Sequence, residues 1–300
     1  MPPDPVLTLA DLESWSRAEP SLAVLGHPIG HSLSPPMHNA ALSALARGEP
    51  RYADWRYFRF EVRPEDLPRA LALLHAAKFR GVNLTVPHKI IAFDRVARVD
   101  EAAVPVGAVN TLLWTEKGWE GFNTDGYGLA TALRETLHQE LGGTPVVLLG
   151  AGGAARGAAV EALARGCAGL WIVNRTEKNR EALLAALRPV MGKIPVRKWD
   201  GAAGPDAPPA GALVVNATSS GLRPDEPAPL NLAAIPRPAA VFDMIYNPPR
   251  TPLLIQAEAL GIPAANGLAM LVHQGAKSLE IWTGAPAART APSMLAALRP

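Results

Sequence analysis

The sequence predicts an α/β protein of two domains, each built on a parallel sheet. Strand and helix patterns alternate from one end of the chain to the other. The strand candidates are short and apolar, which is typical of parallel strands covered on both faces. The length of 300 residues matches about two domains, and the chain holds two successive series of strand–helix units.

The first series begins with the apolar run SLAVLG and ends with GAVNTLLWT. Strand-forming runs alternate there with apolar positions at helical spacing. Strands are predicted at 21–26, 55–62, 81–86 and 107–115, and helices at 35–46 and 64–77. The strand at 55–62 is a candidate sheet edge, which could pair between subunits. We assign no role to the first 20 residues and expect them to be partly frayed.

A domain boundary is predicted within GFNTDGYGLATALRETL, at 121–137. A strand ends there, Asn-Thr-Asp-Gly turns the chain, and a long helix begins. Asp125 suits the N-cap or the first turn of that helix. The tail at 266–282 has an amphipathic helical period, but the pattern does not show where it packs.

The second series repeats the alternation of strand and helix. Strands are predicted at 145–150, 169–174, 194–199, 212–218 and 239–246, with helices after the first two. Proline- and glycine-rich stretches at 200–212 and 221–231 are predicted to be surface loops.

Composition and charge exclude several classes of protein. The net charge is +2 without a block of like charges, so we predict no nucleic-acid arm and no membrane patch. No apolar stretch is long enough for a membrane helix, and the N-terminal stretch lacks the pattern of a signal peptide. The single cysteine, Cys167, excludes a disulfide within the chain and fits a reducing cytoplasm.

No metal site and no nucleotide-hydrolysing motif is predicted. His27 and His31 have ligand-like spacing, but Pro28 and Gly30 between them argue against a helical metal site. No carboxylate is near them in the sequence, so we interpret them as loop or core histidines. The chain also lacks a P-loop and a G-x-S-x-G nucleophile motif.

A glycine-rich turn follows the strand at 145–150. Gly150, Gly152 and Ala155 match G-x-G-x-x-[G/A] between a strand and a helix. Gly150 permits the tight turn, Gly152 lets the backbone approach a pyrophosphate, and Ala155 lets helix and strand pack closely. The exposed N–H groups at the helix start favour an anion. The alternative is a tight turn without a ligand.

The end of the next strand indicates which dinucleotide is preferred. Enzymes that prefer NAD usually carry Asp or Glu there, to bind the ribose hydroxyls. This chain has Asn174, Arg175 and Thr176 instead. A guanidinium pairs well with a 2′-phosphate, so we predict NADP(H) as the cofactor. The alternative is that Arg175 is only a solvated cation.

Three polar clusters follow strands of the first domain. In HSLSP, Ser32 and Ser34 could hold a carboxylate, although Ser34 could instead cap the helix that Pro35 opens. The second cluster is NLTVPHK, at 83–89, and the third is GAVNT followed by NTDG. An enzyme that transfers hydride needs such groups to take a proton and to orient its substrate.

Nine motifs in order closely resemble the shikimate dehydrogenase family. They are GHPIGHSLSP, NLTVPHK, GAVNT, GFNTDG, GAGGAAR, NRT, NATSSG, DMIYNP and NGLAMLVHQ…WTG, and they run from about residue 21 to about 285. The resemblance implies reversible NADPH-dependent reduction of 3-dehydroshikimate to shikimate, in the pathway to chorismate and the aromatic amino acids. It also implies a substrate domain, 1–123 plus 267–300, and a Rossmann-type NADP domain, 124–266, flanking a cleft. The C-terminal helices would return to the substrate domain.

The resemblance also implies roles for individual residues. Lys89 and Asp125 would be the catalytic pair. The protonation state of the lysine stays open. Substrate would be bound by Ser32, Ser34, Asn83, Thr85, Lys89, Asn110, Asp125, Tyr246 and Gln274. The cofactor would be bound by Gly150, Ala151, Gly152, Gly153, Ala154, Asn174, Arg175, Thr176, Lys178, Thr218, Met244, Gly267 and Met270.

Two points stay open within this resemblance. The family often has a further basic residue after NRT, and here Lys178 and Arg180 flank Asn179. A quinate or shikimate dehydrogenase with relaxed substrate choice, and a non-catalytic sensor of shikimate or NADP, are the alternatives. We expect a cytoplasmic monomer or homodimer.

Overall fold

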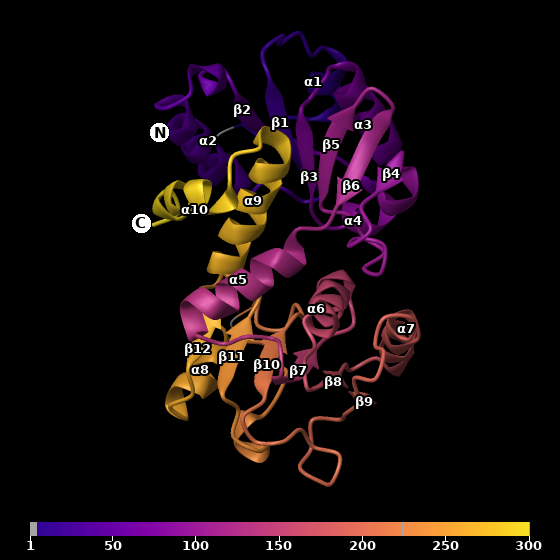
Figure 1. Ribbon diagram of the computed structural model, residues 1–300, viewed down its shortest axis with the longest axis vertical. Helices are drawn as coiled ribbons and strands as arrows, with labels where there is room; N and C mark the ends of the chain where they lie inside the picture. The colour runs from indigo at the N-terminus through magenta and orange to yellow at the C-terminus, as the bar shows by residue number, and fades with distance from the viewer. Residues whose placement is uncertain (1–4, 224, 300) are drawn as a thin grey trace. The chain divides into compact units, whose positions relative to one another are not determined.

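The computed structural model describes residues 5–223 and 225–299. The chain divides into two compact units, Met1–Thr124 with Val272–Pro300, and Asp125–Leu271. The corresponding limits expected from the sequence lie after residues 123 and 266. Each unit contains one six-stranded sheet with helices packed along it, which confirms the predicted α/β class (Figure 1).

The sheet of the first unit is mixed rather than parallel, in the order β2-β1-β3-β5-β6-β4. Its strands are β1 (Ser21–Gly26), β2 (Arg56–Glu61), β3 (Gly81–Leu84), β4 (Arg98–Val99), β5 (Thr111–Thr115) and β6 (Gly118–Phe122). β5 runs antiparallel to both β3 and β6. Our expectation of a parallel sheet was wrong here, because only two residues separate β5 from β6, and so short a loop joins antiparallel strands. Gly118, with a φ of 120°, closes that hairpin.

One face of this sheet carries the apolar core of the unit. The helix α3 (Leu67–Ala76) covers it through Leu67, Leu71 and Leu74. The other short elements of the unit are η1 (Pro50–Tyr52), η2 (Pro64–Asp66), α4 (His88–Ile91) and η3 (Phe93–Arg95).

The N-terminal segment packs on the same core. Leu7 pairs with Phe60 along the edge strand β2, and α1 (Leu9–Glu13) buries Leu12. The Trp15 ring lies 5.0 Å from the rings of both Phe58 and Phe79. The expectation of a partly frayed N-terminus was therefore wrong for residues 5–20, because Leu12 is buried and Leu7, Leu9 and Trp15 pack against the core. Residues 1–4 lie outside the described part of the chain.

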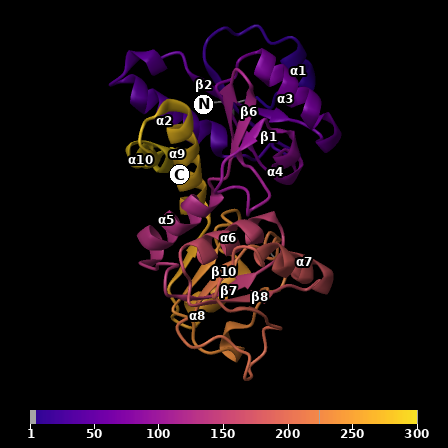
Figure 2. The same cartoon turned by 45° about the vertical axis from the view of Figure 1, so that its right-hand side comes forward.

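The opposite face holds α2 (Ser34–Ala46) and the C-terminal helices α9 (Leu268–Thr283) and α10 (Ala287–Ala296), as predicted. α10 lies beside α2 (Figures 1 and 2). The Trp282 indole donates to the Leu112 carbonyl at 2.9 Å. A Cβ at Gly81 would lie 2.0 Å from the indole nitrogen. Only glycine therefore fits at that point of β3.

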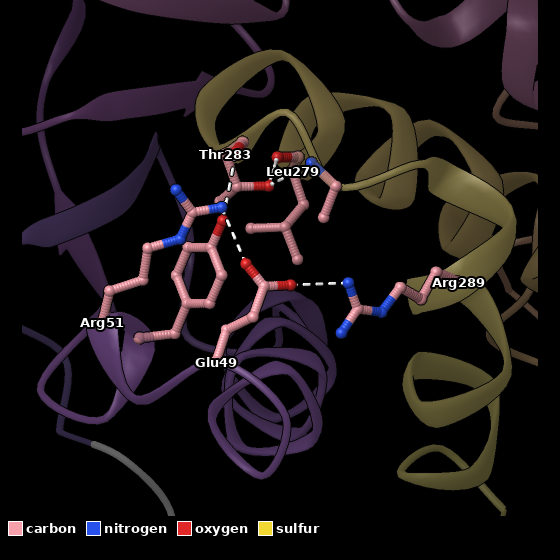
Figure 3. A network of polar contacts seen from close by, with 7 residues as sticks. Glu49, Arg51, Leu279, Thr283 and Arg289 are labelled. Carbon is pink, nitrogen blue, oxygen red and sulfur yellow. Dashed lines mark hydrogen bonds and ion pairs between the residues drawn. The ribbon is translucent and has the colours of Figure 1, made fainter.

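Polar contacts near η1 also hold the C-terminal helices in place (Figure 3). The Tyr52 hydroxyl donates to the Thr283 carbonyl at 3.1 Å. The Glu49 carboxylate bonds to the guanidinium groups of Arg51 and Arg289 at 2.7 and 2.6 Å. Because the arginines are largely exposed, we expect each ion pair to contribute little to stability.

The sheet of the second unit is entirely parallel, in the order β12-β11-β10-β7-β8-β9. Its strands are β7 (Pro145–Leu149), β8 (Gly169–Val173), β9 (Val196–Lys198), β10 (Leu213–Asn216), β11 (Ala240–Asp243) and β12 (Ala264–Asn266). Its helices are α5 (Asp125–Leu137), α6 (Gly153–Ala164), α7 (Glu177–Leu187), η4 (Leu232–Ala234) and α8 (Pro252–Ala259). The strand order reverses between β7 and β10, which is where doubly wound sheets bind ligands. The Rossmann-type prediction is confirmed.

Across 5–223 and 225–299, no helix has the length and apolar content needed to cross a membrane.

Candidate functional site

A cavity of about 870 Å³ opens at the carboxyl ends of β7, β8 and β10 in the second unit. It is lined by the glycine turn, the end of β8, the start of α7 and the loop after β10. Its predicted members are Gly150, Ala151, Gly152, Asn174, Arg175, Thr176 and Thr218. The cavity therefore brings together the glycine turn, the end of β8 and Thr218, and Met244, Gly267 and Met270 are not among the described residues that line it.

The glycine turn has the backbone that the motif requires. Gly150 has a φ of 113°, and its N–H donates to the Val173 carbonyl at 2.8 Å. A Cβ at Gly150 would lie 3.0 Å from the Ala217 carbonyl oxygen, so glycine is favoured on two counts. Gly152 is the N-cap of α6 and has open space where its Cβ would lie. Ala155 is fully buried against the sheet. The turn thus presents free backbone to the cavity at a helix N-terminus, which suits a pyrophosphate.

The end of β8 offers cations and amides to the cavity. The Asn174 amide donates to the Thr176 carbonyl at 2.7 Å, and Arg175 is exposed at the rim. Arg180 also lines the cavity. Its Nη1 donates to the Trp199 carbonyl at 3.3 Å, and its buried Nε has no hydrogen-bond partner among the described residues. These donors fit the 2′-phosphate of NADP.

Lys178 is exposed and, in the described part of the chain, is not among the residues that line the cavity. Of the two basic side chains that flank Asn179, Arg180 is the one directed to this site.

A buried polar network supports Thr218 from beneath. Its N–H and hydroxyl donate to Asn216 Oδ1 at 3.0 and 2.7 Å. The Asn216 amide donates to Asp243 Oδ1 at 3.0 Å, and the Thr251 hydroxyl donates to Asp243 Oδ2 at 2.6 Å. Burial raises the pKa of Asp243 above its usual range. Sequence reasoning did not select Asn216, Asp243 or Thr251, although NATSSG and DMIYNP contain the first two.

Close backbone packing connects two further predicted cofactor positions, Met244 and Gly267. A Cβ at Gly267 would lie 2.0 Å from the Met244 carbonyl oxygen, so this position tolerates only glycine. The Gly267 N–H donates to the Ile245 carbonyl at 3.2 Å. Met244 and Met270 are half-buried, and burial raises the pKa of Tyr246.

Asn83 is the centre of a buried polar cluster in the first unit. Its amide nitrogen lies 3.0 to 3.1 Å from three acceptors, Asn110 O, Thr111 Oγ1 and Ser278 Oγ. Its Oδ1 accepts from the Tyr57 hydroxyl at 2.8 Å. An amide nitrogen has only two hydrogens, so protein acceptors occupy both.

Asn110 connects this cluster to α9. Its Oδ1 accepts from the Thr124 N–H at 2.9 Å, and its amide donates to Gln274 Oε1 at 3.3 Å. The structure thus brings together two predicted substrate residues, Asn110 and Gln274. Sequence reasoning did not select Thr111, Thr124 or Ser278, although GAVNT and GFNTDG contain the first two.

The serine pair lies at the start of α2. The N-cap is Leu33, whose side chain makes no capping bond, so the alternative that Ser34 caps this helix was wrong. Ser34 is buried, and its N–H donates to Ser32 Oγ at 3.3 Å. Both predicted carboxylate ligands therefore lie on one short turn.

Side chains of β2 hold the loop that leads to these serines. The Glu61 carboxylate bonds to His27 Nδ1 at 2.6 Å and accepts from the Ile29 N–H at 2.8 Å. Arg59 Nη1 donates to the Gly30 carbonyl at 2.7 Å. His27 is a loop residue, as expected, but it does have a carboxylate partner. Among residues 5–223 and 225–299, no group of three His, Cys, Asp or Glu side chains is placed to hold a metal ion.

Thr85 and Lys89 follow β3. Between them, His88 is fully buried, and its Nε2 lies 2.9 Å from the Val62 carbonyl, which can only accept. His88 is thus a neutral Nε2–H tautomer, and burial lowers its pKa. The Lys89 carbonyl accepts from the Val109 N–H at 3.0 Å, which fixes the backbone that carries the half-buried lysine.

Asp125 is the first residue of α5, as predicted from the turn before it. It directly follows Thr124, which is anchored to Asn110. Asp125 and Tyr246 belong to the second unit, and the serines, Lys89 and Gln274 to the first.

Comparisons with known proteins show the family of the chain. The family described as "Shikimate dehydrogenase substrate binding domain" matches residues 24–112, and "Shikimate 5'-dehydrogenase C-terminal domain" matches 267–299. The NADP(+) shikimate dehydrogenase of Citrifermentans bemidjiense is 42% identical over 272 residues, which is 87% of this chain and 89% of that protein.

Solved structures give the same result. The shikimate 5-dehydrogenase of Thermus thermophilus, in complex with NADP(H) and shikimate, superposes with a TM-score of 0.78 at 35% identity and covers 93% of this chain and 100% of its own. The ligand-free 5-ketofructose reductase of a Gluconobacter species has a TM-score of 0.77 at 31% identity and covers 92% and 98%. The fold is therefore shared by enzymes with different substrates.

Proposed function

The chain belongs to the shikimate dehydrogenase family, and from this premise we propose that it catalyses the reversible NADP-dependent oxidation of shikimate to 3-dehydroshikimate. The observation that carries the proposal is 42% identity to an NADP(+) shikimate dehydrogenase over 87% of the chain. The TM-score of a 5-ketofructose reductase, 0.77, is nearly equal to the 0.78 of the shikimate 5-dehydrogenase, so the substrate is the point to be tested.

We assign the cofactor to the cavity of the second unit. The glycine turn and the start of α6 would hold the pyrophosphate of NADP, and Arg175 with Arg180 would hold its 2′-phosphate. Thr218, Met244, Gly267 and Met270 would lie on the nicotinamide side. Bound NADP⁺ supplies the hydride acceptor for the reaction.

We assign most of the substrate contacts to the first unit. Ser32 and Ser34 would donate to the carboxylate of shikimate, and Thr85, Asn110 and Gln274 would bind its ring hydroxyls. Asp125 and Tyr246 of the second unit would complete the set. Asn83 would act from behind these residues, since both its N–H groups are taken by protein acceptors.

Lys89 and Asp125 would carry the proton. The C3 hydroxyl of shikimate gives its proton to the Lys89 amine while the hydrogen on C3 leaves as hydride. In the reducing direction, the ammonium group of Lys89 gives a proton to the forming alkoxide. Asp125 orients the lysine and a substrate hydroxyl. A positioned proton acceptor of this kind contributes about 10²- to 10⁴-fold to the rate.

The central experiment combines shikimate or quinate with NADP⁺ or NAD⁺ and follows the absorbance of reduced cofactor. We expect the highest kcat/KM for shikimate with NADP⁺. A higher kcat/KM with quinate would favour a quinate or shikimate dehydrogenase with relaxed substrate choice. No turnover with any pair would favour a non-catalytic sensor of shikimate or NADP. 5-Ketofructose with NADPH extends the panel to the other chemistry seen in this fold.

Lys89→Ala tests the proton-transfer assignment, with Lys117→Ala as its control. Lys117 is an exposed lysine in the hairpin between β5 and β6 of the same unit. We expect kcat to fall by about 10²- to 10⁴-fold in Lys89→Ala alone. A near-normal kcat in that variant would refute the role of the lysine.

Two further assignments belong to this proposal. We place the protein in the cytoplasm, because its single cysteine, Cys167, is free and fits a reducing compartment, and we expect a monomer or homodimer. Gel filtration with light scattering would test the second assignment.

A further inference from the structure

The loop that follows β10 forms one wall of the cavity in the second unit. Its residues Ala217, Thr218, Ser219 and Ser220 all line that cavity. The loop lies outside the helices and strands, and side-chain hydrogen bonds shape it. The Thr218 N–H and hydroxyl donate to Asn216 Oδ1, and the Ser220 N–H donates to Thr218 Oγ1 at 3.1 Å. The Asn216 amide thus organises the turn.

Asp243 determines which way the Asn216 amide points. The two residues are fully buried register partners at the ends of the neighbouring strands β10 and β11. A carboxylate only accepts, so the amide turns its nitrogen toward Asp243 and donates to Oδ1 at 3.0 Å. The amide oxygen is then left for the two donors of Thr218. Without an acceptor at position 243, the amide can turn over and direct its NH₂ group at those donors.

The Asp243 carboxylate is itself held from two other directions. Its Oδ1 also accepts from the Ile245 N–H at 3.0 Å, and its Oδ2 accepts from the Thr251 hydroxyl at 2.6 Å. Thr251 is fully buried and is the N-cap of α8. The Met244 N–H donates to the Asn216 carbonyl at 2.9 Å. Asp243 therefore connects the loop after β10 to the turn after β11 and to the start of α8.

We propose that Asp243 is a positioning residue for the cofactor, which fixes the loop of Thr218 on the nicotinamide side by orienting the Asn216 amide. The inference rests on the proposed function, since it takes Thr218 to lie on that side. Asp243 is fully buried and is not among the described residues that line the cavity, so it acts through Asn216.

The sheet separates this effect from binding of the adenosine half. β8 and β10 lie on opposite sides of β7. Arg175, assigned to the 2′-phosphate, follows β8, whereas Thr218 follows β10. Loss of Asp243 should therefore weaken binding of the nicotinamide half and leave binding of the adenosine half unchanged.

The test compares Asp243→Ala with Asp243→Asn. Calorimetry gives the Kd for NADP⁺ and for 2′,5′-ADP, which has the adenosine phosphates but no nicotinamide. Asp243→Ala removes both acceptor oxygens, and we expect the Kd for NADP⁺ to rise about tenfold while that for 2′,5′-ADP stays within about twofold of the wild type. Asp243→Asn keeps one acceptor oxygen for Asn216 and Ile245, so its Kd for NADP⁺ should stay within about threefold of the wild type.

Ile262→Ala controls for a loss of stability alone. Ile262 is 4% exposed in the apolar core of the same unit and is not among the described residues that line the cavity. This variant should have a lower Tm and the wild-type Kd for both ligands.

Thr218→Val provides a second test should Asp243→Ala fail to fold. It removes the hydroxyl that donates to Asn216 and keeps the size of a half-buried side chain. We expect its Kd for NADP⁺ to rise at least about threefold and its Kd for 2′,5′-ADP to stay within about twofold of the wild type.

Four outcomes would overturn the inference. They are an unchanged Kd for NADP⁺ in Asp243→Ala or, in its place, in Thr218→Val, an equal rise in the Kd for both ligands, an equal rise in Asp243→Asn, and an equal rise in Ile262→Ala. A wild type that binds NADP⁺ but does not oxidise shikimate would refute the proposed activity and leave this inference standing. A wild type that does not bind NADP⁺ would refute both.

Discussion

When the pH falls from about 7.5 to about 5, the protein should lose less stability if His38 is replaced with phenylalanine. His38 lies on α2 and is fully buried against the rings of Tyr57 and Trp282. Neither ring nitrogen has a hydrogen-bond partner among the described residues. Burial without a partner lowers its pKa from 6.5 to about 3, so the folded protein holds this histidine neutral.

The sign and size follow from proton linkage. Between pH 6.5 and about 3 the unfolded chain binds a proton at His38 that the folded protein does not. Stability from this residue is therefore complete above pH 6.5 and is lost as the pH falls toward 3. With these two pKa values the loss is about 2 kcal/mol at about pH 5, and it approaches about 5 kcal/mol below pH 3.

Phenylalanine keeps an aromatic ring on Tyr57 and has no proton to bind. Urea unfolding at both pH values gives the free energies, and tryptophan fluorescence reports on the first unit, where five of the seven tryptophans lie. His38→Phe should lose about 2 kcal/mol less than the wild type between the two pH values. Other titrating groups, including His88 and Asp243, are common to both proteins and cancel in this difference.

His31→Phe, at an exposed loop position, serves as the control and should lose as much as the wild type. If His38→Phe lost as much as the wild type too, the reasoning would be refuted, because the buried imidazole would then not be held neutral by the fold.

Three further substitutions test other parts of the structure, and two more, Lys178→Ala and Gly267→Ala, serve as contrasts. Asn83→Asp puts a carboxyl in a buried site 3.0 Å from the Asn110 carbonyl oxygen. It should lower the free energy of unfolding in urea by about 3 kcal/mol at neutral pH. A decrease of less than about 1 kcal/mol would contradict the proposed network of hydrogen bonds. The loss should be smaller at about pH 5, where the introduced carboxyl is protonated and can donate. Arg175→Asp should raise the KM for NADP⁺ about 10- to 100-fold and leave the KM for NAD⁺ within about threefold of the wild type. Lys178→Ala, which lies outside the cavity lining, should change neither KM much. Equal effects of Arg175→Asp on both cofactors would show that Arg175 does not recognise the phosphate. Gly152→Ala should keep the wild-type Tm, because its Cβ meets open space, yet raise the KM for NADP⁺ about tenfold. Gly267→Ala places a Cβ 2.0 Å from the Met244 carbonyl and should lower the Tm sharply, and a normal Tm in that variant would show that the backbone there can move apart.

The elements that sequence reasoning placed best are those with a strong local signal. The strand Ser21–Gly26 lies within the predicted limits, because six buried residues in a row form an unmistakable apolar run. The glycine turn also has a strong local signal, because the spacing of its glycines matches a known motif between a strand and a helix. The direction of β5 could not be read from its residues, because apolar periodicity is the same in parallel and antiparallel strands. The N-terminal segment was misjudged, because its burial depends on partners such as Phe60 and Phe79 that lie far along the chain.

The same distinction applies to the candidate site. Asn83 stands in a motif beside Thr85 and Lys89, so all three have equal claim to the substrate from the sequence alone. The structure separates them, because a side chain that points into the sheet must satisfy its donors with protein groups. Asn83 is 6% exposed and bonded to protein on both ends of its amide, while Thr85 and Lys89 lie beyond the strand and are only half-buried. Motif membership therefore identifies the strand that carries the chemistry, and burial decides which of its residues can face a ligand. On this reasoning Asn83 is the support on which Asn110 is held, and substitutions of Asn83 should change KM mainly through Asn110.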